Sequence, residues 1–449
     1  MTGQAGDRET IAAIATAVGG AVAILRLSGA DALAIAESCW RGSPPLHRQP
    51  PRRLCLGEIL DPEGQAIDRA LAVRFPAPAS YTGEDMVEIH CHGGGLVART
   101  ILLHLLEAGA RGAEPGEFTK RAFVNGKMDL TQAEAVADIV EAHSLMALRL
   151  GKRQLEGALG RRISTIYDRL TTALADLESQ LDFPEEEIEP ASKSELAATL
   201  AESAKQIDRL QASKLEGEIL RHGIRLVLAG PPNVGKSSLM NAILGRDRAI
   251  VTNLPGTTRD TLEEFAHIRG IPVRLIDTAG LRQARDEVET FGIERTLAEM
   301  KEAQVVLWIS SAEPAAEERD LPPDLARCPT VRVENKCDLK PDETGGEGIV
   351  RVSALTGAGL DELFDAIEKT VWRQPHAEEP EVAVAARHAN LLKTALPALR
   401  DAAECIEREQ LELAAVSLRT AIDAIGRIHG RTVMPDVLDR IFSRFCLGK

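Results

Sequence analysis

The chain has 449 residues, of which 44% are hydrophobic but only 3% aromatic, and a formal net charge of −15 at pH 7. This length is enough for about three domains, and the acidic charge argues against broad, non-specific coating of nucleic acid. Seven scattered cysteines without a CxxC pair are typical of free thiols and argue against a disulfide framework or a zinc site. No apolar run approaches the roughly 18 residues of a membrane span, and no basic region precedes the first apolar stretch. We therefore predict a cytoplasmic protein without a membrane segment.

Residues 1–120 mix short apolar runs with clusters of turn-forming residues. The run AVAILRL (21–27) is typical of a strand, whereas GSPPLHRQPP (42–51) and HGGG (92–95) are turn signals. Strand-like runs between such turns, together with a few helical stretches, predict a compact α+β domain.

Residues 121–220 change to a helical period. Apolar side chains recur every three or four positions from Ile163 to Leu181, which predicts an apolar stripe along one long helix. The acidic segment DFPEEEIEP (182–190) ends that helix as a solvated loop, and a capping-box pattern from Ser192 to Glu195 starts another helix. We expect an all-α segment here.

Residues 221–373 alternate strand-like and helix-like stretches, the pattern of a parallel sheet wrapped by helices. Residues 374–449 again show a helical sequence pattern, which follows the proline- and acid-rich HAEEPEV (376–382). Because helical segments flank the α/β block on both sides, the simplest architecture is an α/β domain inserted into one helical domain.

A glycine-rich loop opens the α/β block. The apolar strand IRLVLAG (224–230) continues into GPPNVGKSS (230–238), which matches GxxxxGK[ST] and is followed by a helix-forming stretch. The backbone N–H groups of such a loop cradle phosphate oxygens at a helix N-terminus. Lys236 is placed to reach the β- and γ-phosphates as a catalytic cation, and the Ser237 hydroxyl to ligate Mg²⁺.

Two further stretches fit the same nucleotide. VRLIDTAG ends a strand in Asp277, suited to a role beside Mg²⁺, and continues to Gly280, whose N–H suits the γ-phosphate. In AIVTNLPGTTRDTLE, Thr258 is the candidate switch residue that closes on Mg²⁺. Ras-like proteins place a water-orienting Gln after the glycine, but Leu281 stands here, so another group must position the attacking water.

Two later stretches fit a guanine base. VRVENKCD ends a strand in Asn335, Lys336 and Asp338, and the Asp338 carboxylate suits the adjacent N–H donors of guanine. RVSALTG supplies Ser353 and Ala354, whose backbone suits the guanine O6. Four such elements in order, each at a strand end, predict a GTPase domain that uses GTP and Mg²⁺.

Several segments together resemble one family, the MnmE (TrmE) tRNA modification GTPases. The resemblance implies an α+β, folate-binding-like N-terminal domain that mediates homodimerisation, an all-α helical domain, and an inserted Ras-like α/β P-loop GTPase domain. It covers nearly the whole chain. The segments that carry it are GPPNVGKSS, VTNLPGTTRD, DTAGLR, SYTGEDMVEIHCHGG, PGEFTKRAFVNGKMDLTQAEAVADIV, DFPEEEIE and the terminal FCLGK.

The resemblance also implies how GTP is hydrolysed. Family G domains dimerise, and K⁺ supplies the positive charge that an arginine finger would give. The family's water-orienting carboxylate falls on Glu289, which fills the gap left by Leu281; the alternative is an ordinary surface acid. The implied K⁺ ligands are Asn233, Thr252, Leu254 (through its carbonyl) and Thr257.

The nucleotide contacts that we expect lie in four groups. They are Asn233, Val234, Gly235, Lys236, Ser237 and Ser238 in the phosphate loop; Thr252, Asn253, Leu254, Pro255, Gly256, Thr257 and Thr258 in the switch loop; Asp277, Thr278, Ala279 and Gly280; and Asn335, Lys336, Asp338, Ser353, Ala354 and Leu355 around the base.

For the N-terminal domain, the resemblance implies a site for a tetrahydrofolate derivative (5-formyl or 5,10-methylene). Its ligands map to Arg26, Glu88, Lys127 and the terminal Lys449. Cationic side chains suit the glutamyl carboxylates of the folate, and Glu88 suits the N–H groups of the pterin as an acceptor. One departure is the stretch ATAVGGAVA before Arg26, which is shorter than in the family and lacks its prolines and arginine.

The tail FSRFCLGK places Cys446 four residues from the end of the sequence, where a prenylation box would also have its Cys, but Gly448 and Lys449 fit such a box badly. If the tail reaches the folate site, the Cys446 thiol suits nucleophilic work on a pyrimidine; otherwise it packs or shapes the tail.

The resemblance implies that the chain drives C5 (carboxymethyl)aminomethyl modification of wobble uridine 34 in certain tRNAs. It would act with an FAD-dependent partner, MnmG (GidA), in a heterotetramer or a larger assembly. The basic stretches RLGKRQ (149–154) and GRR (160–162) suit either RNA contact or solvated helix faces. Two alternatives are an Era-type regulatory GTPase, disfavoured by the acidic helical return after the G domain, and a folate-dependent transferase that needs no GTP.

Overall fold

The structure is a computed structural model in which two units are distinguished by their internal contacts. The first unit comprises Met1–Ala137, Leu155–Leu174 and Arg419–Lys449, and the second comprises Asp138–Gln154 and Ala175–Leu418. The structure describes residues 9–142, 144–182, 193–247, 263–277, 303–311, 328–341, 346, 348–372, 382–446 and 448–449.

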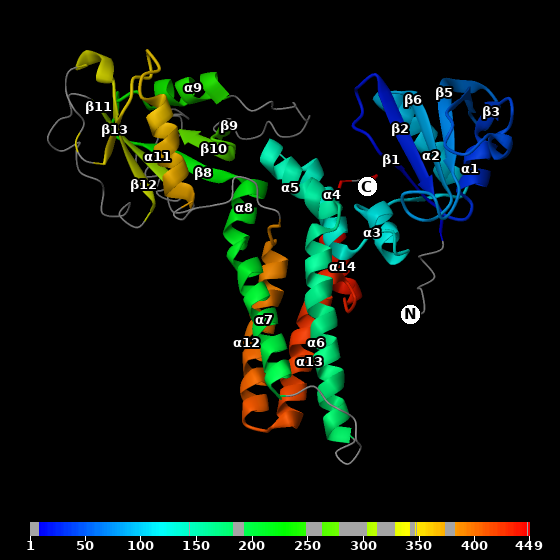
Figure 1. Cartoon of the computed structure of the whole chain (residues 1–449). Coiled ribbons are helices and arrows are strands. Elements are labelled where there is room, and N and C mark those ends of the chain that lie inside the picture. The colour runs from blue at the N-terminus through cyan, green and yellow to red at the C-terminus, as the bar shows by residue number, and fades with distance from the viewer. Residues whose placement is uncertain are drawn as a thin grey trace, which may run out of the picture. The chain divides into compact units, whose positions relative to one another are not determined.

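A seven-stranded sheet forms the core of the first unit (Figure 1), with strand order β3-β4-β5-β6-β2-β1-β7. Alternate side chains of β2 and β6 pack with helices α1 (Ala32–Ser38) and α2 (Gly95–Glu107) in one buried cluster that includes Leu25 and Ile89. The opposite face carries the paired Arg26 and Glu88, and there Ile11 and Ala13 of β1 pack with Phe118 in a second buried cluster. The strands are β1 (Ile11–Ile14), β2 (Val22–Ser28), β3 (Trp40–Gly42), β4 (Cys55–Leu60), β5 (Ala66–Phe75), β6 (Met86–His92) and β7 (Arg111–Gly112), and a 3₁₀ turn, η2, covers Leu46–Arg48.

The carboxyl end of the chain packs against the N-terminal domain of the same unit. Helix α14 (Pro435–Phe442) contacts α3 (Glu117–Val124), where Lys120 forms an ion pair with Asp439 at 2.7 Å. A Cβ on Gly116, which has a φ of 71°, would lie 2.6 Å from the Phe442 carbonyl oxygen. Further helices of the chain are α4 (Leu130–Val140), α5 (Leu145–Leu155), α6 (Ala158–Asp182) and α13 (Leu411–His429).

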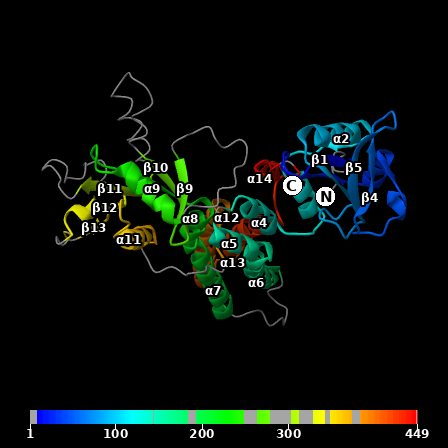
Figure 2. The same cartoon turned by 90° about the horizontal axis from the view of Figure 1, so that it is seen from above.

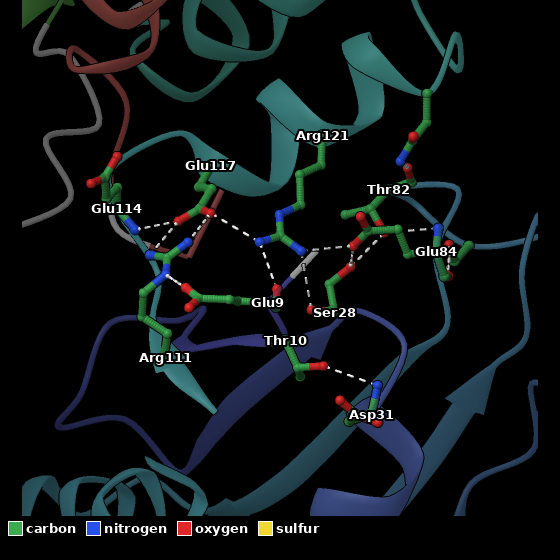
Figure 3. Close-up of polar contacts among 12 residues, drawn as sticks. Glu9, Thr10, Ser28, Asp31, Thr82, Glu84, Arg111, Glu114, Glu117 and Arg121 are labelled. Carbon is green, nitrogen blue, oxygen red and sulfur yellow. Dashed lines mark hydrogen bonds and ion pairs between the residues drawn. The ribbon is translucent and has the colours of Figure 1, made fainter. Parts of the chain in front are cut away.

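A buried ionic network ties α3 to the sheet (Figure 3). Arg121, only 6% exposed, donates to Glu84 Oε2 and Glu117 Oε1, each at 3.1 Å, and to the Glu9 carbonyl oxygen at 2.8 Å. Ser28 Oγ donates to the same Glu84 oxygen at 2.7 Å. The network therefore fixes α3 and the loop around residue 84 on the edge of the sheet.

Glu117 stays ionised at the centre of this network. Burial alone raises the pKa of its carboxyl, but hydrogen bonds from Arg111 and the Glu114 amide, with the charges of Arg111 and Arg121, lower that pKa below its ordinary value. Arg111 and Arg121 thus share one buried carboxylate, as Figure 3 shows.

The second unit contains a six-stranded sheet, ordered β13-β12-β11-β8-β10-β9. All neighbouring pairs are parallel except β9 with β10, so the predicted parallel sheet has one antiparallel edge strand that the sequence did not predict. Helices α9 (Lys236–Asp247) and α11 (Leu360–Trp372) share one buried cluster with this sheet. The strands are β8 (Ile224–Ala229), β9 (Glu263–Ile268), β10 (Ile271–Asp277), β11 (Val305–Ser311), β12 (Thr330–Asn335) and β13 (Ile349–Arg351).

Helical segments from before and after this sheet pack together. Helix α7 (Lys193–Ala212) runs beside α12 (Ala386–Glu407) in both views (Figures 1 and 2). Helix α8 (Lys214–His222) then leads into β8, and its Arg221 donates to Asp138 Oδ2 at 2.6 Å and to the Ala383 carbonyl at 2.8 Å. The predicted insertion of an α/β domain between two helical flanks is confirmed.

The predicted α+β, all-α and P-loop parts are therefore all present. The long helix predicted from Ile163 to Leu181 is α6, and the predicted helix near residue 193 is α7. The segment 183–190 lies outside the described residues. The boundaries 1–120, 121–220, 221–373 and 374–449 stay a prediction. Among the helices that the structure describes, none combines the length and apolarity needed to cross a bilayer.

Candidate functional site

Two glycines allow the loop after β8 to bend tightly. Gly230 has a φ of 149°, and a Cβ there would lie 2.1 Å from the Ile309 carbonyl oxygen. Gly235 has a φ of 94°, and a Cβ there would lie 2.4 Å from Asn335 Nδ2. Both positions therefore require glycine for conformation and for space. The loop leads directly into α9, whose N-terminal N–H groups favour anions.

Lys236 is folded into this loop. Its Nζ donates to the carbonyl oxygens of Gly230 at 2.9 Å and Pro231 at 2.7 Å, and the residue is only 8% exposed. The Lys236 ammonium thus lies against two loop carbonyls, at the N-terminus of α9. This arrangement concentrates positive potential where the sequence predicts the phosphates.

Ser237 and Asp277 meet beside the loop. Ser237 Oγ donates to Asp277 Oδ2 at 2.6 Å, and Asp277 is 5% exposed at the end of β10. Strands β8 and β10 are parallel neighbours, so their carboxyl ends lie at the same edge of the sheet. A hydroxyl and a carboxylate oxygen are ligands of the type that Mg²⁺ prefers. Ser237, a predicted Mg²⁺ ligand, and Asp277, predicted to stand beside the ion, therefore fit it; the other predicted Mg²⁺ ligand, Thr258, lies outside the described residues.

Asn335 holds two loops of the site together. It is 1% exposed, and its Nδ2 donates to the Val234 carbonyl at 2.9 Å. Its Oδ1 accepts from the Ala354 amide at 3.1 Å. Lys336 adds a bond from Nζ to the Asn233 carbonyl at 2.8 Å. The phosphate loop and the two predicted base-binding loops are thereby joined into one site.

A cavity of about 230 Å³ lies at this junction. Asp338 lines it from the 3₁₀ turn η6 (Cys337–Leu339), so a carboxylate faces the space where the sequence predicts a guanine. Leu355 is 87% exposed at its rim, whereas Ser353 is fully buried. The lining residues are Gly235, Ser238, Asn335, Lys336, Asp338, Leu339, Ala354 and Leu355.

The two amides predicted to meet the guanine O6 already donate within the protein. The Ser353 amide donates to the Ala358 carbonyl at 2.9 Å, and the Ala354 amide donates to Asn335. The remaining nucleotide residues (252–258 and 278–280) and Glu289 lie outside the described residues.

A second polar cluster lies on the face of the N-terminal sheet opposite helices α1 and α2. Arg26 on β2 stands opposite Glu88 on β6, and its Nε donates to Glu88 Oε1 at 2.9 Å. The Arg26 guanidinium also lies 5.5 Å from the centre of the Tyr81 ring and 5.6 Å from that of Phe118. This cationic group is held between two aromatic rings and a carboxylate.

The carboxyl-terminal tail reaches the same cluster. Arg26 Nη1 donates to the Gly448 carbonyl at 3.2 Å, although 422 positions separate the two residues. Gly448 has a φ of 88°, and a Cβ there would lie 2.6 Å from the Ile14 carbonyl oxygen on β1. Burial lowers the pKa of the Lys449 ammonium; the neighbouring Cys446 opposes that shift, and the Arg26 charge adds to it.

The structure thus brings together three of the four residues predicted for the folate, namely Arg26, Glu88 and Lys449. Lys127 instead donates to the Pro78 carbonyl at 3.0 Å. Cys446 is exposed within the docked tail. Sequence reasoning missed the rings of Tyr81 and Phe118, since an isolated aromatic residue carries no signal of a cation that stacks on it.

Two family models match the chain. The model of the N-terminus of the GTP-binding protein TrmE matches residues 10–127. The model of the MnmE helical domain matches residues 130–446.

Full-length relatives agree with these models. A tRNA modification GTPase MnmE from Akkermansia muciniphila is 46% identical over 98% of this chain and 99% of its own length. A tRNA modification GTPase MnmE from Symbiobacterium thermophilum is 45% identical over 98% of this chain and 99% of its own length. Among solved structures, the FeoB G-domain from Methanococcus jannaschii is 26% identical and covers 33% of this chain and 98% of its own, with a TM-score of 0.25.

Proposed function

The chain belongs to the MnmE family of tRNA modification GTPases, and we propose that its GTP hydrolysis drives C5 modification of wobble uridine 34 in certain tRNAs. The observation that carries the GTP part is the joined site around Asn335. That buried amide links the phosphate loop, the Lys236 ammonium behind it and the cavity lined by Asp338. Such a site has a place for phosphates and for a base at the same time.

In the proposed mechanism each described group has one task. The Asp338 carboxylate accepts the two adjacent N–H groups of guanine, a pattern that adenine lacks. The Lys236 ammonium exchanges the loop carbonyls of Gly230 and Pro231 for phosphate oxygens. Ser237 and Asp277 would hold Mg²⁺, which would supply positive charge to neutralise the phosphates.

For hydrolysis we propose two further components. Glu289 orients the attacking water, because Leu281 cannot, and K⁺ replaces an arginine finger when two G domains dimerise. Asn233, Thr252, Leu254 and Thr257 would hold K⁺. Asn233 is suited to this role because it lies in the phosphate loop. Its φ of 65° is unusual for a residue with a side chain.

Removal of K⁺ should slow turnover sharply. The proposed ligands would have to match the size of the ion, and Na⁺ is smaller than K⁺. We therefore expect GTP hydrolysis in NaCl to fall about tenfold or more relative to KCl at equal ionic strength, a change of about 1.4 kcal/mol in the barrier. Steady-state phosphate release measures this. Choline chloride serves as the control for ionic strength, and equal rates in all three salts would remove the ion from the mechanism.

We further propose that the chain forms a homodimer through its N-terminal domain and works with the FAD-dependent partner MnmG on tRNA. The added carbon would come from a tetrahydrofolate derivative bound near Arg26, Glu88 and Lys449. The tail docks on Arg26 through the Gly448 carbonyl oxygen, and Cys446 lies two residues before Gly448 in the sequence. This docking supports the proposal, because it brings the tail that carries Cys446 to the residues proposed to bind the folate. The seven unpaired cysteines favour a reducing cytoplasm.

Cys446 offers a separate test of the tail. Cys446→Ser keeps the shape of the side chain but lowers its nucleophilicity, so we expect normal GTP hydrolysis and loss of most C5 modification. The measurement is nucleoside mass spectrometry of tRNA from cells that carry only the variant. Cys405→Ser is the matched control. Full modification by Cys446→Ser would show that the thiol is dispensable.

A further inference from the structure

The polar cluster around Arg26 extends along β6 to His90. Side chains alternate along a strand, so Glu88 and His90 share one face of the sheet, and Ile89 between them points into the core under α1 and α2. Arg26 lies opposite Glu88 on β2, and Ile24 lies opposite His90. His90 is thus the next polar group after Glu88 on the face that the tail covers.

His90 carries a buried nitrogen that makes no hydrogen bond to the described part of the chain. Among the residues that the structure describes, its Nε2 has no hydrogen-bond partner; this buried atom lies 3.5 Å from Glu88 Oε2, and the side chain as a whole is 22% exposed. An orphaned buried nitrogen costs stability, so its presence in a native fold calls for an explanation. A bound ligand that pairs with Nε2 supplies that explanation.

The Glu88 carboxylate divides its two oxygens between two directions. Both Nε and Nη2 of Arg26 contact Oε1 at 2.9 Å, whereas Oε2 faces His90. In the Nε2–H tautomer, His90 is a donor. Glu88 Oε2 and His90 Nε2 therefore present an acceptor and a donor side by side, on a sheet face flanked by the rings of Tyr81 and Phe118.

We propose that Glu88 and His90 together recognise the lactam edge of a bound pterin and that His90 determines specificity for 4-oxo pterins. The pterin N3–H donates to Glu88 Oε2, and its 4-carbonyl accepts from His90 Nε2, which satisfies the orphaned nitrogen. A 4-amino pteridine presents these two groups in the opposite order, an acceptor and then a donor, and so meets Glu88 and His90 with mismatched partners. This inference rests on the folate site of the proposed function.

The test compares two ligands that differ at one atom, 5-formyltetrahydrofolate and its 4-amino analogue, by calorimetry on the full-length protein. The expected preference of the unaltered chain for the 4-oxo compound is roughly 10-fold to 100-fold. In His90→Leu that preference should fall by about tenfold, because one of the two matched bonds is lost. His90→Gln should retain it, since the glutamine amide also donates an N–H group.

His92→Leu is the matched control. His92 lies on the same face two positions along β6, but it is 74% exposed and paired with Asp68, so its removal should leave the preference unchanged. GTP hydrolysis by each variant, expected at the unaltered rate, shows that the chain is folded.

The outcomes distinguish a failure of the proposed role of His90 from a failure of the proposed folate site. If the unaltered chain and His90→Leu bind the reduced folate with the same preference, His90 has no part in recognition, while the folate site stands. If the unaltered chain binds no reduced folate, the folate site itself is wrong, and the role of His90 is overturned with it.

Discussion

Asp338→Asn should exchange the nucleotide specificity of the chain. In the proposed site the carboxylate would accept from two adjacent N–H donors of guanine, whereas an asparagine amide offers one acceptor and one donor in the same place. We expect the affinity for GTP to fall about 100-fold or more, because two charge-assisted bonds are lost and one donor faces another. Xanthosine triphosphate, whose 2-oxo group accepts from that amide, should be bound in its place.

Fluorescent analogues of the two nucleotides measure these affinities directly. Asp361→Asn is the matched control: it makes the same chemical change on α11, where Asp361 is exposed and paired with Arg246, away from the cavity lining. Unchanged affinity of Asp338→Asn for GTP would mean that the cavity at Asp338 is not the base site.

Glu289→Ala should separate binding from hydrolysis. If the Glu289 carboxylate orients the attacking water, its loss lowers kcat by about 10²- to 10⁴-fold while the affinity for GTP is retained. Single-turnover hydrolysis in K⁺ measures the first quantity and equilibrium nucleotide binding the second. The neighbouring Glu287→Ala, which makes the same change two positions earlier, should hydrolyse GTP normally. If Glu289→Ala and Glu287→Ala hydrolysed GTP at the same rate, Glu289 would not be the residue that orients the attacking water.

The nucleotide site was predicted from the sequence because its determinants are local. Gly230 and Gly235 are required by backbone conformation and close contacts, and Asp277 and Asn335 stand at the ends of their strands. Such features repeat wherever a strand, a tight loop and a helix meet around phosphates. The antiparallel pairing of β9 escaped prediction because no local pattern distinguishes an antiparallel edge strand from a parallel one.

The site on the N-terminal sheet was less accessible to sequence reasoning. The contact between Arg26 and Gly448 joins opposite ends of the chain, and only the folded structure shows that the tail docks there. The charges of Glu117 and Arg121 look like surface charges in the sequence, yet both residues are buried. Burial of charged residues depends on their partners, which tertiary packing supplies.

The central claim is that GTP turnover by this chain drives modification of the wobble uridine. Mass spectrometry of nucleosides from total tRNA, in cells with and without the gene, tests it most directly. We expect loss of a C5-substituted uridine in the deletion strain, restored by the intact gene but not by Glu289→Ala. An unchanged nucleoside profile in the deletion strain, or full restoration by a variant that binds GTP without hydrolysing it, would contradict the account.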